Sequence, residues 1–239
     1  MAGCAAAHLP VIPHPSPNFG PRRNGARPDM IVLHHTAMAT PEAALDRLCD
    51  ASAEVSAHYL ICERGQVWRM VEEGMRAWHA GAGQWGDVVD VNSRSIGVEL
   101  ANTGAHPFPA PQMAALETLM AGIIDRWRIA SARVIAHSDM APARKSDPGP
   151  RFDWRGLARS GLAVWPETSA PGSVSEADFL RDAECFGYAV REEVTADDVL
   201  RAFRLRFRPY ATGPLGPEDC AMIADLARRF PVDRDAVTA

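Results

Sequence analysis

The sequence predicts an α/β fold, with a mixed central β-sheet flanked by helices and a small all-α C-terminal module. Three observations lead to this prediction. Over residues 1–166, short apolar runs typical of buried strands alternate with segments of helical periodicity. Residues 167–174 (ETSAPGSV) have the composition of a linker. Residues 175–239 show helical periodicity alone, and this length of roughly 65 residues is enough for three small packed helices.

Short apolar runs mark the expected strands. Residues 30–35 form such a run that ends in polar residues, and residues 95–100 form another, with a glycine inside it. A third and shorter run lies at residues 134–135. Residues 58–62 and 67–71 are separated by an Arg-Gly turn, so they predict a β-hairpin.

The expected helices begin with recognisable signals. Thr40-Pro41 combines a capping hydroxyl with proline at the first helical position. Proline also begins residues 111–127, where apolar side chains recur at helical spacing. Residues 153–165 predict a closing helix and a connection. Residues 8–28, rich in Pro, Asn, Gly and Arg, predict an irregular arm before the sheet.

The C-terminal module contains two clear amphipathic segments, at residues 197–208 and 218–230. In the first, one face is apolar (Leu200, Phe203 and Phe207), and a neighbouring face is basic (Arg201, Arg204 and Arg208). Two interpretations of its arginines remain open. Arg204, Arg206 and Arg208 either bind an acidic glycopeptide or form a solvated helix face beside a phenylalanine-packed core.

Composition limits the possible partners. The formal net charge is -5, which argues against a general nucleic-acid-binding protein. No apolar run approaches the roughly 18 residues that a membrane span needs. We therefore expect that the protein does not bind nucleic acid and has no membrane-spanning segment. We also expect a monomer.

The cysteines indicate a reducing compartment. There are five, with no CxxC pair, so free thiols are expected. The start of the chain, Met1 to Cys4, is similar to the end of a bacterial lipoprotein signal, but no charged and apolar segment stands before it. These features favour a cytoplasmic protein. A lipid-anchored periplasmic form is the alternative if the true start lies upstream of Cys4.

Three residues stand out as a possible metal site: His34 in LHHT, His137 in AHSD and Asp147 in RKSDPGP. Two imidazoles and one carboxylate can hold zinc and leave a fourth position open, which is typical of a catalytic site. His34 and His137 each follow an expected strand, and a loop of ten residues separates His137 from Asp147. Spacing alone makes this a weak candidate, because the first histidine is far from the other two in the chain.

Five motifs occur together in a known order. They are LHHT (33–36), SAHYLI (56–61), AWHAG (77–81), NSRSIGVEL (92–100) and AHSDMAPARKSDPGP (136–150). With them, the chain resembles the zinc N-acetylmuramoyl-L-alanine amidases of the AmpD and AmiD type, relatives of phage T7 lysozyme and the peptidoglycan-recognition proteins. The resemblance covers residues 14–165. More weakly, the C-terminal helices are similar to small peptidoglycan-binding modules.

The resemblance implies a site and a reaction. His34, His137 and Asp147 would bind Zn²⁺, Glu99 would move the proton during amide hydrolysis, and Lys145 would stabilise the oxyanion. On a strand, Gly97 would leave Glu99 room to face the metal. His35, which replaces the tyrosine of some relatives, is expected to be structural or to support a ligand.

Contacts with the substrate are less well defined. His79, Trp78 and Arg94 are candidates, although His79 is equally interpretable as a hydrogen-bonded structural histidine. Some relatives that recognise diaminopimelate carry an arginine shortly before the SIG strand, whereas here Asp90 and an offset Arg94 occupy this region. Selectivity for the peptide stem is therefore not predicted.

The implied function is hydrolysis of the amide between N-acetylmuramic acid, or its 1,6-anhydro form, and L-alanine in peptidoglycan fragments. Such a reaction serves cell-wall turnover and recycling, and muropeptides would be the partners. Two alternatives remain. A non-catalytic peptidoglycan receptor would typically have lost a zinc ligand, and a zinc hydrolase for another amide would explain the altered region around Asp90 and Arg94.

Overall fold

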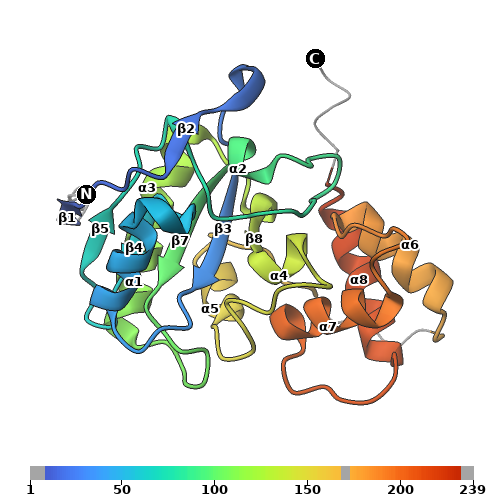
Figure 1. Ribbon diagram of the computed structural model, residues 1–239. Helices are drawn as coiled ribbons and strands as arrows, with labels where there is room; N and C mark the ends of the chain where they lie inside the picture. Colours follow the sequence, from blue (N-terminus) through green and yellow to red (C-terminus); the bar gives the residue numbers. More distant parts are fainter. Residues whose placement is uncertain (1–8, 168–172, 233–239) are drawn as a thin grey trace, which may run out of the picture.

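A computed structural model describes residues 9–167 and 173–232 (Figure 1). Six strands form one sheet in the order β1-β5-β4-β7-β3-β8. They are β1 (Val11–Pro13), β3 (Met30–His35), β4 (Tyr59–Ile61), β5 (Val67–Arg69), β7 (Ser95–Leu100) and β8 (Val134–Ala136). A separate two-stranded sheet pairs β2 (Phe19–Pro21) with β6 (Met75–Ala77).

The large sheet is mixed, as predicted. Strand β3 lies parallel to both β7 and β8, and β4 lies parallel to β7. Strand β5 runs antiparallel to β4 and forms the expected hairpin with it. In the turn of this hairpin the N–H of Gly65 donates to the carbonyl of Cys62 at 2.9 Å, with a φ of 81° at the glycine. The sequence prediction of the fold class is confirmed.

Alternation along β3 assigns its side chains to two faces. Ile31 and Leu33 pack in the cluster that contains α3. Met30 and Val32 point to the opposite face and join a cluster with the C-terminal helices. His34 follows Met30 and Val32 at the same two-residue spacing, so β3 places His34 on that opposite face.

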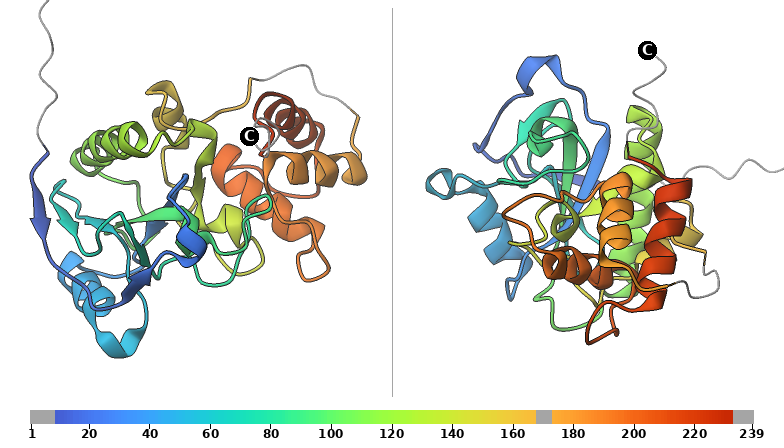
Figure 2. Two further views of the ribbon diagram at one scale, coloured as in Figure 1. Left: turned by 90° about the horizontal axis from the view of Figure 1, so that it is seen from above. Right: turned by 90° about the vertical axis from the view of Figure 1, so that its right-hand side faces the viewer.

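Helices cover both faces of the sheet (Figure 2). The longest, α3 (Ala110–Trp127), packs on one face. The opposite face carries α1 (Pro41–Cys49) near β4 and α4 (His137–Met140) near β3. The remaining helices are α2 (Val91–Arg94), α5 (Trp154–Arg159), α6 (Glu176–Phe186), α7 (Ala196–Phe207) and α8 (Pro217–Arg229), with short 3-10 turns at Arg23–Gly25, Ala51–Ala53 and Ser131–Arg133.

Local signals explain several helix boundaries. The hydroxyl of Thr40 accepts a hydrogen bond from the N–H of Ala43 at 3.2 Å, and Pro41 is the first residue of α1, as expected from the sequence. Asp153 caps α5 by accepting from the N–H of Gly156 at 2.8 Å. These caps satisfy backbone donors that a helix leaves free at its first turn.

Some elements differ from the sequence prediction. The arm expected to be irregular contains β1 and β2, which pair with β5 and β6. Strand β6 and the single-turn helices α2 and α4 were not expected. All of these elements contain only three or four residues. Such short segments carry too few residues for a periodic pattern, so pairing with a distant partner decides their conformation.

The C-terminal segment is helical, as expected, and its arginines are mostly occupied within the protein. Arg204 and Arg208 of α7 both bind the carboxylate of Asp219, at 2.6 and 2.7 Å. Arg206 is buried, with 1% of its surface exposed, so the interpretation of all three as a solvated face is wrong for this residue. The predicted linker 167–174 and the predicted start around Cys4 fall largely or entirely outside the described residues.

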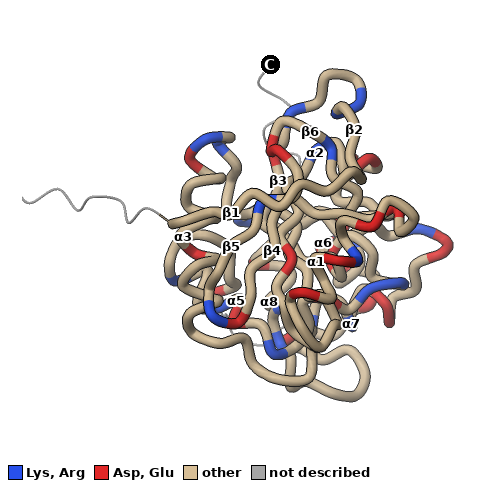
Figure 3. Tube along the Cα trace, turned by 60° about the vertical axis from the view of Figure 1, so that its left-hand side comes forward, with Lys and Arg blue, Asp and Glu red and all other residues tan. Residues whose placement is uncertain are grey.

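Charged residues of both signs are interspersed along the trace (Figure 3). Among helices within residues 9–167 and 173–232, none combines the length and apolar content needed to cross a membrane.

Candidate active site

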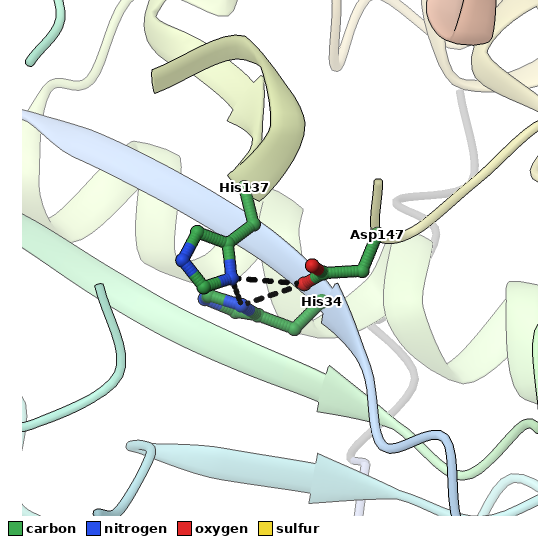
Figure 4. A group of neighbouring side chains, drawn as sticks. All are labelled: His34, His137 and Asp147. Atoms are coloured by element: carbon green, nitrogen blue, oxygen red, sulfur yellow. Dashed lines mark hydrogen bonds and ion pairs between the residues drawn. The ribbon is translucent and has the colours of Figure 1, made fainter. Parts of the chain in front are cut away.

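Three side chains meet at one point on the face of the sheet opposite α3 (Figure 4). The Nδ1 atoms of His34 and His137 lie 2.9 Å apart. The Oδ2 atom of Asp147 lies 3.1 Å from Nδ1 of His34 and 3.0 Å from Nδ1 of His137. These three atoms are close enough to bind a single metal ion. The structure therefore brings together the three residues that the sequence predicted as ligands.

Three neighbouring pieces of backbone position this cluster. His34 lies near the end of β3, and His137 directly follows β8, the strand paired with β3. Asp147 lies in the loop after α4. The N–H of Ser138 donates to the carbonyl of Asp147 at 3.0 Å, which closes this loop onto the first turn of α4. Parallel strand ends thus bring residues about a hundred positions apart into contact.

A chain of hydrogen bonds determines which nitrogen of His34 carries the proton. The hydroxyl of Ser95 donates to the carbonyl of Val91 at 2.6 Å. Its oxygen therefore accepts from Nε2 of His79, at 3.1 Å. This leaves Nδ1 of His79 as an acceptor, and Nε2 of His34 donates to it at 3.0 Å. Nδ1 of His34 is consequently unprotonated and has a free lone pair, an assignment made from the network.

The same arrangement holds for His137. Its Nε2 lies 2.9 Å from the carbonyl oxygen of Ala80, which can only accept, so Nε2 carries the proton. Nδ1 of His137 is then free of a proton. Arg144 also donates to the carbonyl of Ala80, at 2.9 Å. Arg144 therefore supports the loop behind His137.

The arrangement fits a metal cation. Two unprotonated ring nitrogens and one carboxylate oxygen converge within about 3 Å of one another. Lone pairs held this close repel each other unless a cation lies between them. Burial, and then the nearby His137, lowers the pKa of His34 to about 4, so this ring is neutral at neutral pH, as a metal ligand requires.

Glu99 lies beside this cluster. In the register of β3 and β7 it is the direct partner of His34, and it lines the same cavity of about 440 Å³. Its Oε2 atom is buried and has no hydrogen-bond partner within the described part of the chain. Burial, and then the charge of Asp147, raises the pKa of Glu99 to about 8, while Lys145 acts in the opposite direction. A divalent cation would lower this pKa.

Lys145 lines the cavity from the loop that also carries Asp147. Its backbone N–H donates to the carbonyl of Ala141 at 2.9 Å, which holds this loop against the end of α4. No hydrogen bond or ion pair of its ammonium group occurs among the described residues. The positive charge is therefore available to a molecule in the cavity.

The three candidate substrate contacts occupy different places. Trp78 lines the cavity. His79 also lines it, but both of its ring nitrogens are occupied by His34 and Ser95. Arg94 does not line this cavity; its guanidinium binds the carboxylate of Asp29. This placement favours a supporting role for His79 and does not support substrate contact by Arg94.

One residue of the site was not recognised from the sequence, and a second has a different neighbour from the one expected. Ser95 completes the hydrogen-bond chain behind His79. Gly97 lies directly against the ring of His79, where an added Cβ would be 2.4 Å from Cγ. Gly97 was expected to make room for Glu99, whereas the close approach is to His79. Both residues precede Glu99 on its side of β7, a period-two pattern that could have identified them.

The cavity continues away from the three ligand atoms. Ala44, Arg47 and Leu48 of α1 and the nearby Val55 also line it. His35 and Thr36 line the part near the end of β3. The cavity lining therefore combines the histidines and Asp147 with apolar residues and with Arg47.

Comparison with known proteins agrees with this geometry. Residues 24–150 match the family described as N-acetylmuramoyl-L-alanine amidase. The chain is 33% identical to the N-acetylmuramoyl-L-alanine amidase AmiD of Escherichia coli, over 87% of this chain and 86% of AmiD. It is also 31% identical to the 1,6-anhydro-N-acetylmuramyl-L-alanine amidase AmpD of E. coli, over 65% of this chain and 92% of AmpD.

Solved structures give the same result. E. coli AmiD, in complex with anhydro-N-acetylmuramic acid-L-Ala-D-γ-Glu-L-Lys, superimposes with a TM-score of 0.79, covering 85% of this chain and 90% of AmiD. AmpDh3 of Pseudomonas aeruginosa, with an anhydromuramic pentapeptide, is 30% identical with a TM-score of 0.79, covering 87% of this chain and 94% of AmpDh3. The shared sequence, fold and site show that this chain belongs to the N-acetylmuramoyl-L-alanine amidase family.

Proposed function

We propose that this protein is a zinc-dependent amidase that cleaves the bond between the lactyl group of 1,6-anhydro-N-acetylmuramic acid and L-alanine in peptidoglycan fragments. One observation carries the proposal: two unprotonated imidazole nitrogens and a carboxylate oxygen converge in one cavity. Glu99 and Lys145 line the same cavity. The substrate is proposed from the relatives whose structures contain anhydromuramyl peptides.

Zinc is the metal that best suits this donor set. His34 and His137 would each bind it through Nδ1, and Asp147 through a carboxylate oxygen. The second nitrogen of each imidazole donates to an acceptor within the protein, which keeps both rings oriented and in the correct tautomer. When bound, zinc supplies Lewis-acid chemistry, because it polarises a carbonyl and makes water available as a nucleophile near neutral pH.

Glu99 would act as the general base and acid. Its carboxylate lies beside His34 on the neighbouring strand and has one oxygen without a partner among the described residues. It can take a proton from the attacking water and return it to the leaving nitrogen of the amide, which must be protonated to depart. Burial raises the proton affinity of this carboxylate, so it can hold the proton between the two steps.

Lys145 would stabilise the negative charge that develops on the carbonyl oxygen. Lys145 lines the cavity, and no carboxylate among the described residues pairs with its ammonium group. A cation already in place needs no reorganisation when the oxyanion forms, and a water-poor cavity increases its effect. We assign Lys145 this role, with Arg144 supporting the loop.

A single experiment tests the proposal. Purified protein is analysed for bound metal and then incubated with anhydromuramyl tripeptide, while mass spectrometry follows release of the peptide. About one zinc per chain and cleavage before L-alanine are expected. Glu99→Gln is the matched variant and should keep the metal but lose activity. Metal-bound protein that leaves the substrate intact would favour the receptor alternative, and cleavage at another amide would contradict the substrate assignment.

The compartment and oligomeric state are also proposals. We infer a monomer that acts in the cytoplasm on recycled muropeptides. The thiols of Cys49, Cys62, Cys185 and Cys220 are all free, which suits a reducing compartment. Fractionation of cells that produce the full gene product tests the compartment, and membrane-associated protein would contradict the cytoplasmic assignment. Light scattering of the purified protein tests whether it is a monomer.

A further inference from the structure

The C-terminal helices share a core with the sheet that carries the proposed metal site. One apolar cluster contains Met30 and Val32 of β3 and Ile135 of β8 together with Phe179, Val199 and Phe203 of the C-terminal helices. Helix α7 lies near α4 in Figure 1, and the two helices are in direct contact. The C-terminal helices are thus packed against the strands that end at His34 and His137.

An ion pair crosses this shared core. Nη1 of Arg206, in α7, binds Oδ2 of Asp139, in α4, at 2.6 Å, and both side chains are completely buried. Nη2 of Arg206 donates to the carbonyl of Val134 at 3.0 Å, at the beginning of β8. The same carboxylate accepts from the hydroxyl of Tyr188 at 2.8 Å, so a second C-terminal residue reaches it.

The guanidinium group of Arg206 is enclosed by aromatic rings from both sides of the contact. Its Cζ lies 4.4 Å from the ring centre of Trp154 in α5 and 4.8 Å from that of Phe207. Such stacking favours a cation in a buried position. Removal of Arg206 would leave the carboxylate of Asp139 without a counterion, and water does not reach Asp139 to replace it.

Asp139 in turn holds the turn that begins with His137. Its Oδ2 atom accepts from the N–H of Ala136, the residue before His137, at 2.9 Å. The same turn connects to the rest of the site through the bond from Ser138 to the carbonyl of Asp147. Asp139 therefore lies where the backbone of His137 and the loop carrying Asp147 meet.

A second arginine of α7 contacts the loop after this turn. Nη2 of Arg201 donates to the carbonyl of Pro142 at 2.5 Å. One helix of the C-terminal segment thus contacts the backbone before His137, through Asp139, and the backbone between His137 and Lys145. A shift of α7 would be transmitted to both parts of the site.

We propose that Arg206 is a positioning residue of the active site, which acts through Asp139 to hold His137 in place for the metal. This inference rests on the proposed function of His137 as a ligand. It assigns the C-terminal helices to the catalytic unit: they complete the site instead of serving only as a separate substrate-binding module. Supporting groups of this kind typically change metal affinity by about 10- to 100-fold.

The test compares two arginines of α7 that each form an ion pair with a buried aspartate of another helix. Arg206→Met removes the partner of Asp139, and Arg204→Met removes a partner of Asp219 within the C-terminal helices. For each full-length variant, zinc affinity is measured by competition with a chromophoric chelator, alongside kcat, KM and thermal stability. Tyr188→Phe, which removes a single hydrogen bond to Asp139, provides a milder variant if Arg206→Met does not fold.

Arg206→Met should weaken zinc binding at least about tenfold. It should also lower kcat by a larger factor than that by which KM changes. Tyr188→Phe should weaken zinc binding by about two- to tenfold, the range for one hydrogen bond. Arg204→Met should lower the thermal stability but leave zinc affinity and kcat at the wild-type values. The proposal is overturned if Arg206→Met or Tyr188→Phe folds and binds zinc as the wild type does, or if Arg204→Met causes equal losses. Failure of the wild type to cleave muropeptide would instead contradict the proposed function, and zinc affinity would still decide the role of Arg206.

Discussion

Nε2 of His34 donates a hydrogen bond to Nδ1 of His79 across 3.0 Å, and this contact frees the other nitrogen of His34. His79 is held in turn by Ser95, whose hydroxyl proton is committed to the carbonyl of Val91. A residue that the sequence presented as a possible substrate contact is therefore placed to support a metal ligand. The chain of donors determines the tautomer as well as the orientation of the ring.

The first prediction concerns this chain of hydrogen bonds. His79→Ala should weaken zinc binding by about 10- to 100-fold, because Nε2 of His34 loses its acceptor and the ring is free to rotate. Ser95→Ala should have a smaller effect in the same direction. Chelator competition gives both affinities, and His106→Ala, at an exposed histidine, is the control. Unchanged zinc affinity in His79→Ala would show that the hydrogen bond does not orient His34.

A second prediction follows from the close contact between β7 and His79. In Gly97→Ala the new Cβ would lie 2.4 Å from Cγ of His79, so the ring must move. We expect a loss of about 1–3 kcal/mol in the free energy of unfolding and weaker zinc binding. Gly20→Ala is the matched control, because nothing lies within 4 Å of its added Cβ. Chemical denaturation of both variants checks this, and equal stability would contradict the close packing.

The strands that carry the site could be predicted from the sequence because their patterns are local. The apolar run before His34, the segment SIGVEL and the helix at residues 110–127 each contain enough residues to show a period. The three proposed ligands followed from motifs. Their meeting point depends on the pairing of β3 with β7 and β8, which no local pattern specifies.

Other features depended on contacts that a sequence pattern does not encode. Arg206 is one of the alternating arginines of AFRLRFRP. Helical spacing separates it from the face of Arg204 and Arg208, but the pattern does not show that it is buried with a counterion. Its burial results from Asp139, 67 residues earlier, which supplies the counterion. Similarly, His79 was equally interpretable as a substrate contact because its partners, His34 and Ser95, lie 45 and 16 residues away.

The third prediction is a pH dependence in the metal-free protein. The pKa of Glu99 is raised from 4.5 to about 8, so the folded state holds this proton more strongly than the unfolded state. Its contribution to stability is therefore complete below about pH 4.5 and is lost as the pH rises through about 8. Glu99→Gln has no such proton to lose. The stability of the wild type relative to this variant should therefore fall as the pH rises from about 4.5 to about 8.

Thermal denaturation in the presence of a chelator measures this difference. Glu42→Gln, at an exposed position of α1, serves as the control and should parallel the wild type. Added zinc should reduce the pH dependence, since a cation favours the carboxylate form of Glu99. If the wild type and Glu99→Gln gave the same pH profile in chelator, the pKa of Glu99 would be unshifted, and burial of this carboxyl group would not affect its proton.

The fourth prediction concerns a stabilising network away from the site. The buried carboxylate of Glu73 accepts hydrogen bonds from Tyr59, Arg126 and Trp127, at distances of 2.5 to 3.0 Å. Glu73→Gln should lower the free energy of unfolding by about 2 kcal/mol, because charged hydrogen bonds are weakened. Activity at 25 °C should not change. A loss of activity without a loss of stability would place Glu73 in an unexpected functional role.

This network also has a predicted pH dependence. Burial tends to raise the pKa of Glu73, but the hydrogen bonds from Arg126, Trp127 and Tyr59 outweigh it and hold the pKa below its usual value. The stabilisation is thus present above the pKa of the unfolded chain, about 4.5, and is lost as the pH falls through the lower pKa of the folded state. The difference in unfolding free energy between wild type and Glu73→Gln should accordingly shrink on acidification below about pH 4.

The central claim is that His34, His137 and Asp147 together hold one metal ion. X-ray absorption spectroscopy of the zinc-loaded protein at the zinc edge tests it most directly. The account predicts two imidazole ligands, oxygen in the remaining positions and no sulfur, with one imidazole lost in His137→Ala. A spectrum that contains sulfur ligands, or one that is unchanged in His137→Ala, would contradict it.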